Sequence, residues 1–171
     1  LVERYFGAFL DEILRRGGDV NETAGDGLMA IFQDPDPGRH ARAAVKTALA
    51  IIRRTRDIGR QRGAGEEPIR VHVGVNSGVA TVGATKIEGR TGTRWTYTAS
   101  GPVTNVAARL AALETTDGIV VGAETRRRLG DEFAFEALGE QRLRNVEQPV
   151  AVFRLAAPAP SPATVPAPVG T

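Results

Sequence analysis

The chain has 171 residues, of which 42% are hydrophobic and 25% are charged, a composition typical of a soluble globular domain with a full hydrophobic core. It contains no cysteine, so disulfides and thiolate metal sites are excluded. No run of about 18 apolar residues is present, so we expect no direct membrane contact. The net charge is only +2. Because the basic residues are spread out, with one tight cluster at 126–128, we expect no nucleic-acid partner.

The first part of the chain predicts a helix followed by a hairpin. Residues 1–16 carry apolar side chains at helical spacing, and the two glycines at 17–18 end that helix. Residues 21–32 predict a tight β-hairpin, because Gly25-Asp26-Gly27 is a turn sequence. The apolar run at 28–32 is typical of a buried strand.

A second helix and two extended segments follow. A Pro/Asp loop over residues 33–38 precedes apolar residues from 41 to 52 at helical spacing, and this pattern fades near 59–65. Alternating Ile and Val predict a strand over residues 69–75. A second extended run is expected over residues 79–82.

The rest of the chain predicts short elements that close the fold. In order we expect a Gly/Thr-rich polar loop at 83–94, a strand at 95–99, a helix beginning at Ser100-Gly101-Pro102, a strand at 119–121, a helix at 123–129, and antiparallel strands at 133–138, 141–143 and 150–155. Helices and strands are mixed, with no internal repeat, so the fold class is α+β or α/β with one sheet.

The domain boundaries follow from composition. We expect one folded domain over residues 1–155 and an Ala/Pro-rich disordered linker over residues 156–171, which is too poor in large apolar side chains to fold. The chain starts inside the first helix without an initiating methionine. We therefore expect it to be a fragment of a longer protein.

Asp26, at the predicted hairpin tip, is the first candidate for a chemical role. A carboxylate between two glycines stands at a sheet edge with nothing crowding it. Such a group can bind a hard cation such as Mg²⁺, whose usual protein ligands are one or two carboxylates together with substrate phosphates. Asp-Gly also makes turns without any further role, and the hairpin sequence by itself favours that simpler interpretation.

Asn105 and Arg109 are the second candidates. They lie four residues apart on one predicted helix, so both project from the same face, next to the core-facing Val106 and Leu110. An amide and a guanidinium suit recognition of ribose and phosphate oxygens. Taken alone, such a pair is more often a solvated helix surface.

Four motifs together resemble the class III nucleotidyl cyclases, the adenylate and guanylate cyclases. They occur in register over residues 1–155: GGDVNETAGDGLMAIF at 17–32, VGVNSG at 73–78, YTASG at 97–101 leading into NVAARL at 105–110, and LGE at 138–140 followed by PV at 149–150. Each motif is weak alone, and the four in order make a specific match.

The resemblance implies a ferredoxin-like sheet with helices on one face, working as a head-to-tail homodimer with shared active sites. In the implied reaction the ribose 3′-hydroxyl of ATP or GTP attacks the α-phosphate, giving the 3′,5′-cyclic monophosphate and pyrophosphate. The implied cofactors are two Mg²⁺ (or Mn²⁺) ions per site. Asp26 matches the second metal aspartate, Asn105 the ribose-orienting residue, and Arg109 the arginine that stabilises charge at the reacting phosphate. Nucleoside triphosphates are inside the cell, so we expect a cytoplasmic location.

The chain departs from the family at its start. The family carries its first metal aspartate on a central strand before the first helix, and this chain begins after that strand. Without it, one metal ligand is missing and strand edges are unpaired. We therefore expect the 171 residues alone to be catalytically silent and the full-length parent to be the active lyase.

The resemblance implies that Glu22 and Thr98 contact the base. Adenine-specific relatives carry Lys at the first position and guanine-specific relatives carry Glu, because adenine N1 needs a donor whereas guanine N1–H and N2–H₂ need acceptors. Thr98 can donate to guanine O6 or accept from the adenine amino group. Hydrogen bonding therefore favours GTP, while bacterial cyclases of this kind are more often adenylate cyclases, and the purine stays open.

The chain also departs from the family at the residues expected to bind the triphosphate. Relatives usually have two lysines near the start of the last hairpin, one of which binds the triphosphate. Here Arg144 stands at one basic position and Val146 at the other. Arg144 is therefore the expected phosphate ligand, with Lys86 and Arg94 in the polar loop as alternative cations.

The competing hypothesis is a non-catalytic cyclase-like module used for dimerisation or regulatory nucleotide binding. Retention of Asp26, Asn105 and Arg109 together favours catalysis, because a scaffold would not need all three. A ferredoxin-like RNA-binding domain fits poorly, because no aromatic pair stands on one strand face as a base-stacking platform.

Overall fold

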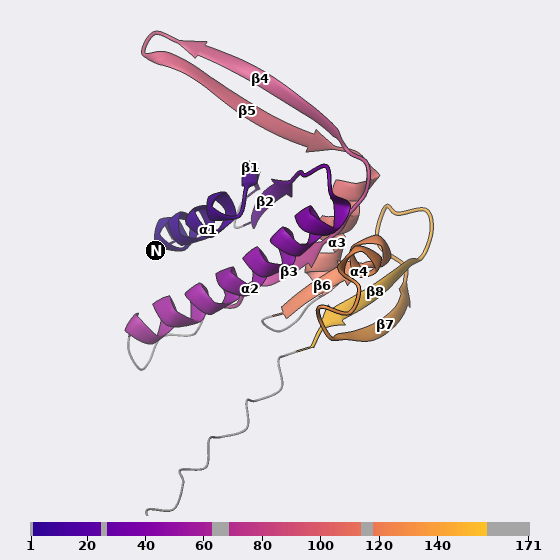
Figure 1. The fold of residues 1–171 in the computed structure, drawn as a ribbon. Helices are drawn as coiled ribbons and strands as arrows, with labels where there is room; N and C mark the ends of the chain where they lie inside the picture. The colour runs from indigo at the N-terminus through magenta and orange to yellow at the C-terminus, as the bar shows by residue number, and fades with distance from the viewer. Residues whose placement is uncertain (1, 25–26, 63–68, 114–117, 157–171) are drawn as a thin grey trace, which may run out of the picture.

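The structure is a computed structural model that describes residues 2–24, 27–62, 69–113 and 118–156. Figure 1 shows the arrangement of its helices and strands. In chain order the elements are α1 (Val2–Arg15), β1 (Gly18–Ala24), β2 (Gly27–Phe32), α2 (Pro37–Arg62), β3 (His72–Val75), β4 (Thr81–Gly89), β5 (Gly92–Ser100), α3 (Pro102–Leu113), β6 (Gly118–Gly122), α4 (Ala123–Leu129), β7 (Phe135–Gln141) and β8 (Val150–Leu155). The predicted α+β class is confirmed.

The N-terminal helix and hairpin form as predicted. In α1, Tyr5, Phe9 and Ile13 are buried along one face, as their helical spacing requires. Gly17 ends the helix with a positive φ of 75°. β1 and β2 are antiparallel, and the Ala24–Gly27 pair closes the hairpin. β2 is half-buried, not buried as expected, because the two strands form a separate two-stranded sheet.

A four-stranded sheet in the order β3-β6-β8-β7 carries the main core. Alternate residues of β6 face opposite sides: Ile119 and Val121 pack with α2 and α4, and Val120 packs with α3. Helices therefore cover both faces of this sheet. The resemblance implied helices on one face of the sheet. α2 and α4 do share one face, but α3 lies on the other face.

Two strand predictions are wrong in extent. The strand expected over residues 69–75 is limited to β3, which pairs in parallel with β6 from His72 to Val75. The polar loop expected at 83–94 is instead most of a long hairpin, in which β4 and β5 pair from the Thr81–Ser100 pair to the Gly89–Gly92 pair. The prediction of a loop rested on the Gly and Thr content of these residues. Threonine, however, is β-branched and favours extended backbone. This hairpin projects from the rest of the chain (Figure 1).

The closing region contains two strands and not three. β7 runs without interruption to Gln141, because a register shift next to Gly139 (φ 76°) makes a bulge instead of an end. The separate strand expected at 141–143 is absent from the described residues, and Leu143 is buried in the connection to β8. The predicted helix boundaries at Pro102 and over α4 are confirmed. Residues 157–171, where the linker was expected, lie outside the described residues.

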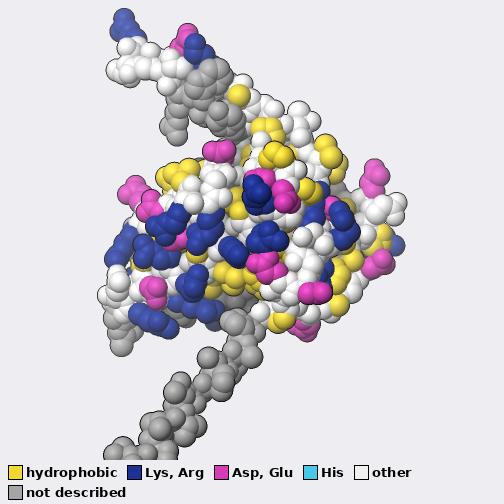
Figure 2. All heavy atoms as spheres, viewed as in Figure 1, with side chains coloured by type: hydrophobic (Ala, Val, Ile, Leu, Met, Phe, Trp, Pro, Cys, Tyr) yellow, Lys and Arg dark blue, Asp and Glu magenta, His cyan; other side chains and the backbone are white. Residues whose placement is uncertain are grey.

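Basic side chains lie mainly on helix surfaces. Figure 2 shows Lys and Arg gathered along α2, whose exposed arginines include Arg53 and Arg60. In the 126–128 cluster, Arg127 and Arg128 bind Glu124 at 2.6 and 2.7 Å. The cluster is thus tied to α4 itself. No helix of the described ranges is long and apolar enough to cross a membrane.

Candidate functional site

The position of α3 depends on a close approach to β3 at Gly74. A Cβ atom added at Gly74 would lie 2.2 Å from the Ala107 carbonyl oxygen and 2.4 Å from the Ala111 nitrogen, well inside van der Waals contact. Glycine is therefore needed for α3 to lie this close to the sheet. At the start of α3, Asn76 Nδ2 donates to the Val103 carbonyl at 3.1 Å. These two contacts set where the α3 side chains stand.

Arg109 is held in α3 beside the fully buried Leu110. Its side chain is half-buried, and its Nε is a buried donor without an acceptor in the part of the chain that the structure describes. A guanidinium is always charged and offers five donors. Leaving such a donor buried and unpaired is unfavourable, so an anion that accepted its hydrogen bonds would be well bound.

Asn105 connects the same helix to the loop before β8. Its Nδ2 donates to the Asn145 carbonyl at 3.1 Å, and Asn145 adopts a left-handed φ of 61°, which asparagine tolerates. Leu143 anchors this loop in the core beneath α3. Arg144, between these two residues, is exposed, so the structure brings its loop next to Asn105.

Val146 shows why the second basic position of this loop is apolar. It packs against the cluster that contains Val106, Leu110 and Leu143, where a charged side chain would be desolvated. Of the two alternative cations, Lys86 is ion-paired with Glu88 on the projecting hairpin, and the side chain of Arg94 is not described. Lys86 therefore already has an ionic partner, whereas Arg144 is exposed next to Asn105.

The two strands that carry the base candidates lie side by side. The Ala99 backbone N–H donates to Asn21 Oδ1 at 3.0 Å, which links β5 to β1. Thr98 precedes Ala99 and its side chain is exposed. Glu22 follows Asn21 in β1, but its side chain lies outside what the structure describes.

Asp26, the predicted metal ligand, lies outside the described residues, between Ala24 and Gly27. Across the described ranges, no group of three or more His, Cys, Asp or Glu side chains could hold a metal ion. The meeting of Asp26 with Asn105 and Arg109 of a second copy therefore remains a prediction.

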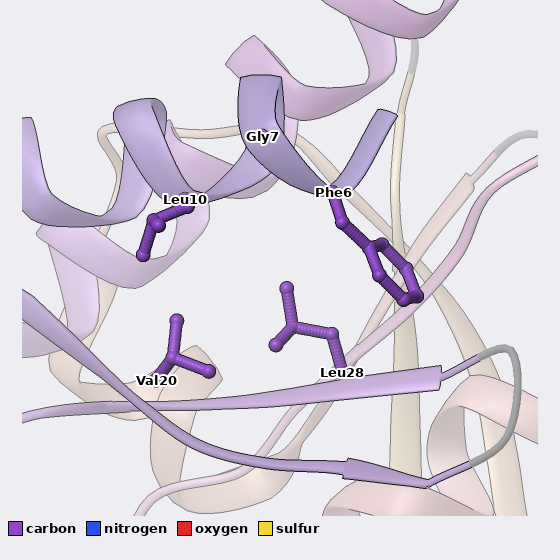
Figure 3. Close-up of a pocket in the computed structure, with 5 residues that line it drawn as sticks. All are labelled: Phe6, Gly7, Leu10, Val20 and Leu28. Carbon is purple, nitrogen blue, oxygen red and sulfur yellow. The ribbon is translucent and has the colours of Figure 1, made fainter. Parts of the chain in front are cut away.

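The cavity between α1 and the β1–β2 hairpin does not suit a nucleotide. It has a volume of about 200 Å³ and is lined by Phe6, Gly7, Leu10, Val20 and Leu28. Figure 3 shows the side chains of Phe6, Leu10, Val20 and Leu28 around an apolar space. A triphosphate needs charged donors, and none of these lining residues supplies one.

Two of the displaced pKa values belong to carboxylates in structural ion pairs. Hydrogen bonds from Arg127 and Arg128 lower the pKa of Glu124 to about 2. A hydrogen bond from Arg16 lowers the pKa of the buried Glu12 carboxyl. Neither carboxylate is one of the sequence-predicted site residues.

Comparison with known proteins gives the family. A sequence model of the adenylate and guanylate cyclase catalytic domain matches residues 2–156. The chain belongs to this family. It is 30% identical over 123 residues to adenylate cyclase 1 of Rhizobium meliloti (strain 1021), a match that covers 71% of this chain and 18% of that protein. A second Rhizobium meliloti relative is 31% identical, over 13% of its own length, so the chain spans under a fifth of either relative.

Solved cyclase domains share the fold. The adenylyl cyclase CyaB from P. aeruginosa superposes with a TM-score of 0.80 at 24% identity, covering 92% of this chain and 81% of that one. The guanylate cyclase domain of RhGC from Catenaria anguillulae, solved in complex with GTP, gives 0.73 at 22% identity, covering 91% and 81%. The predicted class III cyclase fold is confirmed.

Three residues of this cyclase-family site were not singled out from the sequence. Gly74 and Asn145 act through the backbone, by close approach and by a left-handed turn, and a lone Gly or Asn in a pattern does not reveal such roles. Asn21 gave a usable signal, because asparagine is depleted in strands and stands there between Val20 and Glu22.

Proposed function

We propose that this domain is a nucleotidyl cyclase, a phosphorus–oxygen lyase that converts ATP or GTP into the 3′,5′-cyclic monophosphate and pyrophosphate in cyclic-nucleotide signalling. The observation that carries the proposal is the environment of the Arg109 guanidinium. Its Nε is buried without an acceptor among the residues that the structure describes, on the same face of α3 as Asn105. A stability role would not leave a guanidinium donor unpaired, whereas a phosphate would satisfy it.

Each site residue has a role consistent with its contacts. Arg109 donates to the reacting phosphate, where negative charge builds up during the attack. Asn105 uses its Nδ2 on Asn145, which leaves Oδ1 to accept from a ribose hydroxyl. Arg144, exposed beside Asn105, binds the outer phosphates.

The base is read by Glu22 and Thr98. An ionised Glu22 accepts from guanine N1–H and N2–H₂, and Thr98 donates to guanine O6. This argument favours GTP. Thr98 also suits the adenine amino group, so both purines belong in the assay.

The metal belongs to the proposal through Asp26. Members of the family generally use divalent metal ions, and one carboxylate with substrate phosphates is a usual Mg²⁺ environment. When bound, two Mg²⁺ or Mn²⁺ ions would activate the 3′-hydroxyl and neutralise the phosphates. We propose that Asp26 supplies one of the two carboxylates that the resemblance implies, and that the 171 residues alone do not turn over.

We further propose a head-to-tail homodimer in the cytoplasm, where the triphosphates are. Asp26 of one protomer would face Asn105 and Arg109 of the other. Complementation tests this arrangement: mixing the Asp26→Asn and Arg109→Ala variants of the full-length protein should restore part of the activity that both lack. A mixture as inactive as its components would contradict shared sites.

The direct test compares Arg109→Ala with wild type. In the full-length protein, loss of the guanidinium should lower the cyclisation rate by about 10²-fold or more and weaken binding of α,β-methylene GTP. Arg53→Ala, which removes an exposed arginine of α2, is the matched control and should change neither. Equal binding by wild type and Arg109→Ala would refute the phosphate role. Binding without turnover in the full-length protein would instead favour the non-catalytic module.

A further inference from the structure

Asn21 stands at an irregularity in the β1–β2 hairpin. Val20 pairs with Ala30 and Glu22 pairs with Met29, so Asn21 has no partner in the register. A bulge of this kind turns a side chain out of the regular ladder, and bulges are frequent next to active sites. The bulge therefore points to a purpose for the Asn21 side chain outside its own hairpin.

The Asn21 amide is used as a link to β5. Its Oδ1 accepts the Ala99 N–H at 3.0 Å, while its Nδ2 is buried without an acceptor among the described residues. The amide orientation follows from the Ala99 contact, because a flipped amide would set two donors against each other. An orphaned donor lowers stability, so the amide is not optimised for stability.

The linked strands are the ones that carry the base candidates. Ala99 is buried and the adjacent Thr98 is exposed, because neighbouring side chains of a strand point to opposite faces. The hydrogen bond between Asn21 and Ala99 therefore fixes β5 one residue away from Thr98. On β1, Asn21 directly precedes Glu22. The hydrogen bond between Asn21 and Ala99 thus helps to set the position of one strand with a base candidate against the other.

We propose that Asn21 is a positioning residue for purine selection: it holds β5 against β1 so that Thr98 and Glu22 meet the same base edge. The proposal rests on the proposed function. Two side chains on different strands discriminate between bases only if they are held within about 0.5 Å of the productive geometry. The triphosphate contacts on α3 do not depend on this bond, so its loss affects selection and spares phosphate binding.

The test measures the ratio of dissociation constants for α,β-methylene ATP and α,β-methylene GTP, which cannot be cyclised, on the full-length protein. In Asn21→Leu the ratio should move toward unity by about tenfold, the equivalent of one hydrogen bond, and the Ala99 amide should lose protection from hydrogen exchange. Asn21→Asp, which keeps the acceptor, should retain both the ratio and the protection. If Asn21→Leu does not fold, Asn21→Ala carries the same expectations.

Asn76→Leu is the matched control, because it also removes an asparagine bonded to a neighbouring backbone, here at Val103 on α3. It should weaken both analogues equally and leave their ratio unchanged. A wild-type ratio of one, or an unchanged ratio in Asn21→Leu after Ala99 has lost protection, overturns the proposal. Full-length wild type that binds neither analogue refutes the proposed function itself, which separates the two failures.

Discussion

Replacing Gly74 by alanine tests whether the α3–β3 contact positions the site. The added Cβ would meet the Ala107 oxygen at 2.2 Å and the Ala111 nitrogen at 2.4 Å, whereas ordinary contact begins near 3.4 Å. Both obstructing atoms are backbone, so no side-chain rotation relieves the clash. α3 must therefore retreat from β3 by more than 1 Å, away from its core contacts with Val120.

The expected loss is large for the addition of one methyl group. Overpacking costs typically 1–3 kcal/mol, and a clash against fixed backbone belongs near the upper end, so we expect unfolding free energy to fall by about 3 kcal/mol. A displacement of about 1 Å in Asn105 and Arg109 should also weaken catalysis by about 10²-fold in an active form of the protein. Urea unfolding measures the first effect, and analogue binding reports the second.

Gly7→Ala is the control, because Gly7 lies inside α1 with nothing within 4 Å of an added Cβ. This substitution should raise the unfolding free energy by about 0.5–1 kcal/mol, since alanine is the better helix former. If Gly74→Ala unfolded at the wild-type midpoint, the close approach of α3 to the sheet would be wrong and the placement of Asn105 and Arg109 would lose its basis.

Three further substitutions test the scaffold. Glu12→Gln removes a carboxylate that is 5% exposed and binds Arg16 at 2.6 Å; we expect a loss of about 2 kcal/mol at pH 7. Because the pKa of Glu12 is lowered from 4.5, its contribution is present above pH 4.5 and disappears as the pH falls through the folded-state pKa, so urea midpoints of variant and wild type should converge in acid. Thr125→Val removes a fully buried hydroxyl that lies 2.8 Å from Ser77 Oγ and should lower the unfolding free energy by about 1 kcal/mol; an unchanged thermal midpoint would contradict this. Glu124→Gln, at a carboxyl whose pKa is lowered to about 2, should be less stable than wild type from pH 7 to pH 5 and equal to it near pH 2; a constant difference across that series would show that the charge is not what matters.

The elements that the sequence predicted well are those with local signals. Pro102 begins α3 because its fixed φ suits the first helical position, and Gly17 ends α1 because it takes a positive φ. The hairpin predicted over residues 21–32 is confirmed in its two antiparallel strands, while residues 25–26 at its tip lie outside the described residues. The β4–β5 hairpin was missed because Gly and Thr occur in both loops and strands, and only pairing over the whole Thr81–Ser100 length decides between them.

The sequence predicted only part of the candidate site, because some of its contacts join residues that are far apart in the chain. The i, i+4 spacing placed Asn105 and Arg109 on one face, but no local pattern connects Asn105 with Asn145, 40 residues away. That contact exists because Leu143 is buried under α3. In the same way, the sequence does not show that Arg109 Nε is buried without an acceptor among the described residues. That property depends on how the surrounding elements pack in three dimensions.

The same kind of hydrogen bond occurs at three places in the candidate site. Three asparagines each bond a backbone group of a neighbouring element: Asn21 to Ala99, Asn76 to Val103 and Asn105 to Asn145. Each hydrogen bond adds only about 1 kcal/mol to stability, yet each fixes one element that carries a candidate ligand. Loss of any one should therefore disturb nucleotide recognition more than it disturbs folding. This also explains why hydrophobic periodicity, which finds the core, does not find the residues that position the site.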